Sequence, residues 1–168
     1  MAYSKSQVRN RRSKNVTSSE HQMVVKMALR CLRELTKAKY ELPKFDQPIR
    51  IFTKCKGQHS HGGFGGITID ISAFRKGDIF IQEYDAYKKC KIIGAAKTDH
   101  PETALFATVA HEVAHYVQYR YLPNSRLKNV YRKSHGEGFK TIYGYLRRSL
   151  INAKVEPMSE NDWSIYTS

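Results

Sequence analysis

Apolar residues recur at intervals of three and four in three stretches of the chain, a spacing typical of amphipathic helices. The pattern predicts helices over residues 17–40, 101–121 and 134–152. In each helix the apolar positions gather on one side, so that this side is expected to face the protein core.

Residues that favour helix starts support these boundaries. In a capping box, a Ser or Thr side chain accepts a hydrogen bond from the backbone amide three residues later, and a Glu at that position returns the bond. Thr17 with Glu20, and Ser134 with Glu137, fit this pattern. Pro101 suits the first turn of the middle helix because its missing amide hydrogen would have no partner there.

Three short runs between the first two helices predict β-strands at residues 49–53, 67–72 and 79–84. The second run alternates isoleucine with polar residues, as expected for a strand with one buried face. The glycine-rich residues 57–66 are expected to form a loop or a hairpin connection between the first two strands.

The length of 168 residues fits one domain. We expect residues 1–16, with five cations and little to bury, to be a flexible basic arm. Residues 17–156 would form the folded domain and residues 157–168 an acidic tail. The N-terminus lacks the apolar segment of a signal peptide, and no apolar run approaches the roughly 20 residues that span a bilayer. We therefore expect a cytoplasmic protein without a membrane partner, with the nucleoid or the nucleus as alternatives inside the cell.

Positive charge is the most unusual feature of the composition. Lysine and arginine number 29 against 15 acidic residues, which gives a net charge of +14. Such a chain attracts polyanions, and nucleic acid is the commonest polyanion in cells. We expect DNA as a partner, bound through the basic surface and the N-terminal arm; solubilising surface charge and an acidic protein partner are the alternatives. Tyrosines alternate with cations over residues 119–133, where they could stack on single-stranded bases or simply cover the core.

Candidate chemistry is concentrated in the middle helix, where residues 111–115 read His-Glu-Val-Ala-His. On an α-helix, His111 and His115 lie about 40° apart around the axis and about 6 Å apart along it, so that both imidazoles can converge on one metal ion. Glu112 lies at the edge of the same face, where it can reach a water on the metal without binding the metal. The alternative is a set of ordinary surface side chains on an amphipathic helix.

Hydrolytic zinc sites usually combine three protein ligands with one water molecule. His135 is the best third ligand, because it lies in the first turn of the last predicted helix and shares a face with Phe139 and later apolar residues. Glu137 competes for this role, although the predicted capping box already occupies its carboxylate. A core histidine held by a hydrogen bond is the alternative interpretation of His135.

A second small metal site is a further hypothesis for Cys55, His59 and His61. Their spacing matches no strong metal-site pattern, and a glycine-rich loop is the simpler interpretation. With Cys31 and Cys90, the chain has three cysteines and no CxxC pair, so neither a disulfide framework nor a cysteine-based zinc ribbon is expected.

The motif at residues 111–115, followed by His135-Gly136-Glu137-Gly138-Phe139, resembles the HExxH and HGxxF signature of the SprT-like metalloproteases. The resemblance covers about residues 20–150. It implies an α+β, zincin-like fold with helices packed on a small antiparallel sheet of about three strands. It also implies His111, His115 and His135 as ligands of Zn2+, Glu112 as general base, and proteolysis close to nucleic acid. Many members carry a C-terminal zinc ribbon that this sequence lacks, so that DNA would have to bind the catalytic domain or the arm.

We therefore expect a zinc-dependent endopeptidase that cleaves nucleic-acid-associated proteins. The alternative is a nucleic-acid- or partner-binding module with a zincin fold, whose metal site is structural or inactive. Tyr119, Tyr131 and Tyr143 are candidate donors to the oxyanion of the reaction. The predicted strands at residues 67–72 and 79–84 are candidate edges for backbone pairing with a substrate chain.

Overall fold

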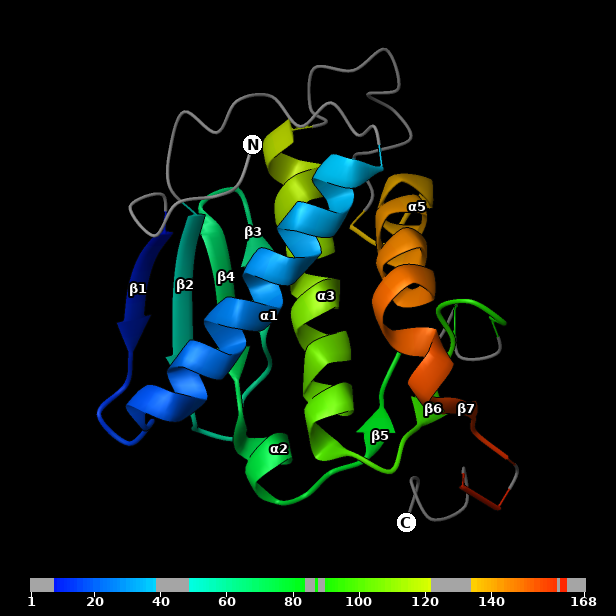
Figure 1. Ribbon diagram of the computed structural model, residues 1–168, viewed down its shortest axis with the longest axis horizontal. Helices are drawn as coiled ribbons and strands as arrows, with labels where there is room; N and C mark the ends of the chain where they lie inside the picture. Colours follow the sequence, from blue (N-terminus) through cyan, green and yellow to red (C-terminus); the bar gives the residue numbers. More distant parts are fainter. Residues whose placement is uncertain are drawn as a thin grey trace.

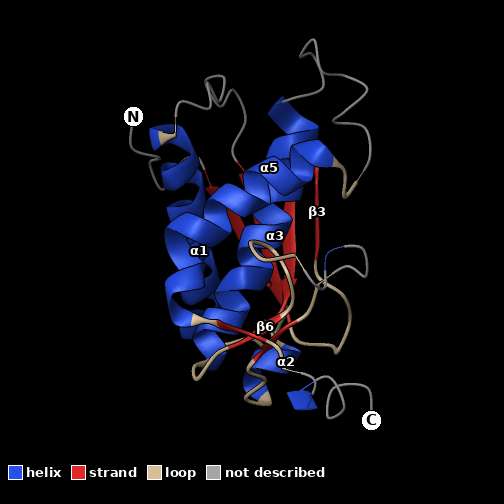
Figure 2. Ribbon diagram, turned by 90° about the vertical axis from the view of Figure 1, so that its right-hand side faces the viewer, coloured by secondary structure: helices blue, strands red, loops and turns tan. Residues whose placement is uncertain are grey.

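The computed structural model describes residues 8–38, 49–83, 87, 90–121, 134–159, 161 and 162. The chain has a mixed α and β fold in which the long helices lie on one face of a four-stranded sheet (Figures 1 and 2). A smaller sheet lies beside them (Figure 1). None of the described helices is long and apolar enough to cross a membrane.

Two long helices match the predicted stretches closely. Helix α1 (Ser18–Lys37) begins after Thr17, whose hydroxyl accepts from the Glu20 amide while the Glu20 carboxylate accepts from the Thr17 amide. The first predicted capping box is therefore confirmed. Helix α3 (Pro101–Tyr121) has the predicted bounds.

The third helix begins later than predicted. Helix α5 (Glu137–Leu146) is continued by a π-helical turn, η3 (Arg147–Ile151), and a 3₁₀ turn, η4 (Asn152–Lys154). Its N-cap is Gly136, with no side-chain hydrogen bond, so the capping box predicted at Ser134 is wrong. The pattern failed because Ser134 lies in a turn that precedes the helix.

Four strands form the main sheet, in the order β1 (Val8–Arg12), β2 (Ile49–Lys54), β4 (Gly66–Asp70) and β3 (His61–Gly63). Strands β1, β2 and β4 are parallel, and β3 alone is antiparallel to its neighbour β4. The expected antiparallel arrangement is therefore wrong for most of this sheet. Helix α1 returns the chain between β1 and β2, and parallel neighbours require such a crossover, whereas the short turn between β3 and β4 produces an antiparallel pair.

The smaller sheet is antiparallel and contains only two-residue strands. Its order is β5 (Phe80–Ile81), β6 (Ala96–Lys97) and β7 (Glu156–Pro157). Only the centre of the strand predicted at residues 79–84 is therefore confirmed, and residue 84 lies outside the described residues. A short helix, α2 (Ser72–Arg75), connects β4 to this part of the fold.

Strand β1 corrects the prediction of a flexible arm. Its residues carry no apolar alternation, yet they pair in register with β2, and the buried Val16 anchors the connection to α1. Residues 1–7 lie outside the described part of the chain. In the predicted tail, Asp162 is buried and its carboxylate accepts from the Lys97 ammonium at 3.2 Å, so that this residue is held against β6.

Helix α3 lies at the centre of the core. It contacts α1, α5 and the strands β3 and β4 (Figure 1). The buried apolar side chains of this helix are Ala104, Leu105, Phe106, Ala107, Val109, Ala110, Val113, Ala114, Tyr116 and Val117. Such extensive burial fixes the position of α3 against its neighbours.

Strand β3 lies within the segment expected to be a loop or a hairpin connection, and it forms a hairpin with β4. Its approach to α3 requires a glycine. A Cβ atom at Gly62 would lie 2.1 Å from the backbone oxygen of Glu112. At Gly63, no atom lies within 4 Å of the corresponding position. The backbone of β3 therefore rests directly on α3 at the predicted site.

Asp70, at the end of β4, holds the loop that leads into β3. Its carboxylate accepts from the amides of Lys56, Gln58 and Ser72 at 2.9–3.1 Å. Burial raises the pKa of Asp70, but hydrogen bonds from Ser72, Gln58 and Lys56 outweigh it and hold the pKa below its usual value. The loop is thus tied to the end of the central strand.

Replacing Gly62 by alanine is expected to lower the free energy of unfolding by about 1–3 kcal/mol, because β3 and α3 must separate to admit the methyl group. Gly63→Ala is the matched control in the same strand and should change stability by less than about 0.5 kcal/mol. Urea denaturation of the two variants measures the difference. Equal stabilities would contradict the close approach at Gly62.

Candidate metal centre

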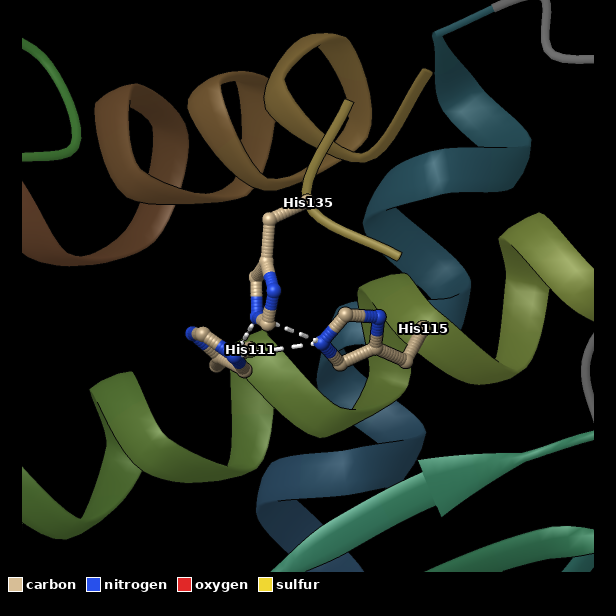
Figure 3. A group of neighbouring side chains, drawn as sticks. All are labelled: His111, His115 and His135. Carbon is tan, nitrogen blue, oxygen red and sulfur yellow. Dashed lines mark hydrogen bonds between the residues drawn. The ribbon is translucent and has the colours of Figure 1, made fainter. Parts of the chain in front are cut away.

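Two segments of the chain bring the three predicted histidines together. His111 and His115 lie one turn apart on α3, and His135 comes from the turn that precedes α5 (Figure 3). The Nε2 atoms of His111 and His115 are 3.2 Å apart, and the Nε2 atom of His135 lies 3.3 Å and 3.1 Å from them, respectively. All three imidazoles therefore converge on one point.

These separations fit a tetrahedral metal site. Nitrogen ligands about 2.0–2.1 Å from a tetrahedral ion would lie about 3.3–3.4 Å from one another. Within the described ranges, His111, His115 and His135 form the one group of three or more potential ligands close enough to share an ion. The alternative ligand Glu137 is not a member of it, and neither is any residue of the hypothetical second site. The centre can hold a metal ion, and imidazole donors suit zinc, copper, iron and nickel.

Burial keeps two of the imidazoles in the form that binds metals. Burial lowers the pKa of His115 to about 3, and the charges of His111 and His135 act in the same direction. Burial, followed by the charge of His111, also lowers the pKa of His135. Because metals bind the neutral imidazole, both rings are prepared to act as ligands at neutral pH.

Phe139 forms a common support for the three rings. Its centroid lies 4.4 Å from that of His115, in a stacked arrangement, and 4.7 Å and 5.0 Å from those of His111 and His135. The Tyr87 hydroxyl donates to the backbone oxygen of His135 and so holds the turn that carries this ligand. The aromatic residue four positions after His135 is thus explained by packing against the ligands.

Glu112 lies beside the metal centre and against β3. Its side chain is buried, and burial raises its pKa to about 7. The charge of His111 and a hydrogen bond from the Gly62 backbone oppose this shift. The close approach of β3 to α3 therefore also bonds the predicted base to the edge strand.

Glu83 is a residue of the site that the sequence patterns missed. Its side chain is only 1% exposed, and a carboxylate oxygen lies 3.6 Å from Nδ1 of His111. Its other oxygen accepts from the Tyr143 hydroxyl and from the guanidinium of Arg147. Nothing in the local sequence signals this role, because the three partners come from α3, α5 and η3.

A cavity of about 280 Å³ opens beside His111 and Glu112. Loop residues 58–60 and the segment around β5 form its other walls. A larger cavity of about 990 Å³ lies at the beginning of α3 and is lined by none of the three histidines. The smaller cavity therefore touches the candidate centre at His111 and Glu112, and neither His115 nor His135 lines it.

The predicted tyrosines differ in their availability. The hydroxyl of Tyr143 donates to Glu83 from a fully buried position, so that it is already engaged. The ring of Tyr119 stacks on His115 with centroids 6.0 Å apart, which places it beside the metal centre. Tyr131 lies outside the described residues, as do most of the alternating tyrosines and cations.

No family model, curated protein or solved structure matches the chain. The interpretation of the site therefore rests on its residues and their geometry.

Replacing His135 by alanine is expected to weaken binding of a divalent metal ion by more than about 100-fold, because even residues that only orient a ligand contribute roughly 10–100-fold. His100→Ala, which removes an exposed imidazole at the other end of α3, should leave binding unchanged. Metal content and thermal unfolding with and without chelator provide the measurement. In the parent protein, metal at 100 times its Kd should raise the free energy of unfolding by about 2.7 kcal/mol. Equal metal binding by the two variants would contradict the three-histidine centre.

Proposed function

We propose that the protein is a zinc-dependent endopeptidase of the SprT-like type that cleaves proteins associated with nucleic acid. The observation that carries this proposal is the convergence of three imidazole Nε2 atoms on one point, next to Glu112 and to a cavity that His111 and Glu112 line. Three histidines with an open fourth position are a ligand set of catalytic zinc. A structural site with all positions filled by protein would have no use for a buried carboxylate beside it.

The reaction would divide between the ion and Glu112. Zinc supplies a Lewis acid that polarises a peptide carbonyl and makes a water molecule more acidic. Glu112 would accept a proton from the attacking water and deliver it to the leaving amine. Its position one residue after His111 keeps it beside the ion without making it a ligand. Tyr119, whose ring stacks on His115, is the described candidate for donating to the oxyanion.

Strand β3 is the proposed binding edge for the substrate chain. It ends the main sheet, whereas β4, which was expected as a candidate edge, lies between β2 and β3 and is excluded. Gly62 brings β3 onto α3 at Glu112, so that an extended peptide paired with β3 would pass the catalytic group.

The face of the main sheet opposite the helices supports nucleic acid as a partner. Arg50 is exposed on β2, and exposed Arg11 on β1 lies in register with the partly exposed Phe52. Together with Asn10 and Ile51, these three residues line a hollow of about 330 Å³. Neither arginine forms an ion pair with any described residue. Guanidinium groups beside an aromatic ring suit the phosphates and bases of a single strand.

Glu112→Gln is expected to reduce cleavage of an unfolded protein substrate by roughly 10²–10⁴-fold, the usual contribution of a general base, while zinc binding is retained. Glu102→Gln, an exposed substitution in the first turn of the same helix, is the matched control. Cleavage is followed by electrophoresis and zinc content is measured on the same samples. Full cleavage by the Glu112 variant would refute its proposed role. An absence of cleavage in the parent would favour the binding module with a structural or inactive metal site.

Replacing Arg11 and Arg50 together by alanine is expected to weaken binding to single-stranded DNA and to reduce its salt dependence. Loss of two phosphate contacts should lower the slope of log K against log salt by about 1.4, since each contact contributes about 0.7. Lys26→Ala with Arg33→Ala removes the same charge from exposed positions on α1 and should lower the slope less. Fluorescence anisotropy at several salt concentrations tests this. Identical slopes for the two double variants would exclude the sheet face opposite the helices as the DNA-binding surface.

A further inference from the structure

The buried carboxylate of Glu83 lies where three elements of the fold meet. Two residues after β5, its side chain reaches His111 on α3, Tyr143 on α5 and Arg147 in η3. The side chains of Glu83 and Arg147 are 1% and 2% exposed, respectively. A charged pair this deep in the protein is costly to desolvate, and apolar residues of similar size often replace such pairs without loss of stability. A contribution to folding stability therefore does not explain why Glu83 and Arg147 are buried as a charged pair.

The two oxygens of Glu83 have different surroundings. Oε1 accepts from the Tyr143 hydroxyl and from Nη1 of Arg147, at 3.3 Å in the second case. Oε2 is buried and has no hydrogen-bond partner. The nearest ionic partner of Oε2 is Nδ1 of His111, at 3.6 Å. The unpartnered oxygen thus faces the ring of a candidate metal ligand.

The side of the His111 ring that Glu83 faces decides whether Glu83 can bind the ion or only the ring. Nε2 of His111 points toward the other two histidines, and Nδ1 is the nitrogen on the remote side of the ring (Figure 3). Glu83 therefore cannot share the ion held by the three Nε2 atoms. It can accept the Nδ1 hydrogen, and the neutral ring then carries its lone pair on Nε2.

Arg147 is itself held in place by hydrogen bonds, and it can therefore orient the Glu83 carboxylate. Its guanidinium donates to the backbone oxygen of Gly94 through both Nη atoms at 3.3 Å, and its Nε donates to the Asn152 side chain at 2.8 Å. These bonds hold the positive charge beside Glu83 independently of His111. The carboxylate is therefore oriented by partners other than the ring that it faces.

We propose that Glu83 is a positioning residue of the metal centre. In this role the 3.6 Å separation between Oε2 and Nδ1 of His111 shortens, and Oε2 accepts the Nδ1 hydrogen. This bond would fix the tautomer and the ring angle that direct Nε2 at the ion, while Arg147 and Tyr143 hold the carboxylate in place. Partners of this kind contribute roughly 10–100-fold to metal affinity in other proteins. The inference rests on the same metal centre as the proposed function, but it requires no peptide cleavage.

A double substitution separates positioning from structural support. Glu83→Met combined with Arg147→Met removes both buried charges and keeps an apolar core, so that the metal-free protein should unfold near the parent temperature. Zinc affinity, measured by competition with a chromophoric chelator, should nevertheless fall by roughly 10–100-fold. A folded double variant with the parent zinc affinity would overturn the proposal.

Tyr143→Phe is the matched control, because it removes a hydrogen bond to Oε1 and leaves Oε2 in place. Because Arg147 still donates to Oε1, the zinc affinity of this variant should fall much less than that of the double variant. A loss as large as that of the double variant would assign the effect to general loosening of the site and would also overturn the proposal.

The parent protein alone provides a second measurement if the double variant does not fold. In ¹⁵N-histidine NMR spectra of the metal-free protein at neutral pH, His111 should be the tautomer with hydrogen on Nδ1. Hydrogen on Nε2 would refute the inference. Because neither measurement depends on proteolysis, an inactive protein would refute the proposed function while the role of Glu83 is still decided.

Discussion

Three imidazole nitrogens that lie 3.1–3.3 Å apart repel one another unless a proton or a cation lies between them. The fold must therefore supply the free energy that holds them together in the absence of an ion. Burial of α3 fixes two of the rings, and the packing of Phe139 against all three brings the first turn of α5 to the same point. The core and the metal centre consequently share the same contacts, and an ion would replace repulsion by attraction.

Those parts of the site that depend on local geometry could be predicted from the sequence. The relation between His111 and His115 follows from helix periodicity alone. His135 was predicted from the apolar face that it shares with Phe139, and it lies close to His111 and His115 even though the capping box used to dismiss Glu137 does not exist. The two lines of reasoning differ because side-chain periodicity reports burial over many residues, whereas a cap depends on a single turn.

The missed features depend on contacts between distant segments. Strand β1 has no apolar alternation that would predict it. Its extended structure comes from pairing with β2, a strand that lies far along the chain. The parallel sheet follows from the path of α1 across it, and β3 depends on the Gly62 contact with Glu112, which no local pattern describes. Glu83 is the clearest case, since its neighbours follow it by 28, 60 and 64 residues. The zincin-like arrangement and the enzymatic activity are proposals, and they rest on the three histidines and Glu112.

The division of the ligands between helix α3 and the turn before α5 has a kinetic consequence. His111 and His115 are presented together by one rigid helix, so that an arriving ion can be chelated by them before His135 closes on it. Departure of the ion requires the turn before α5 to move away from α3, and the Tyr87 bond and the Phe139 stack both resist this movement. Metal exchange should accordingly follow the rate of a local opening at the beginning of α5 rather than the rate of global unfolding.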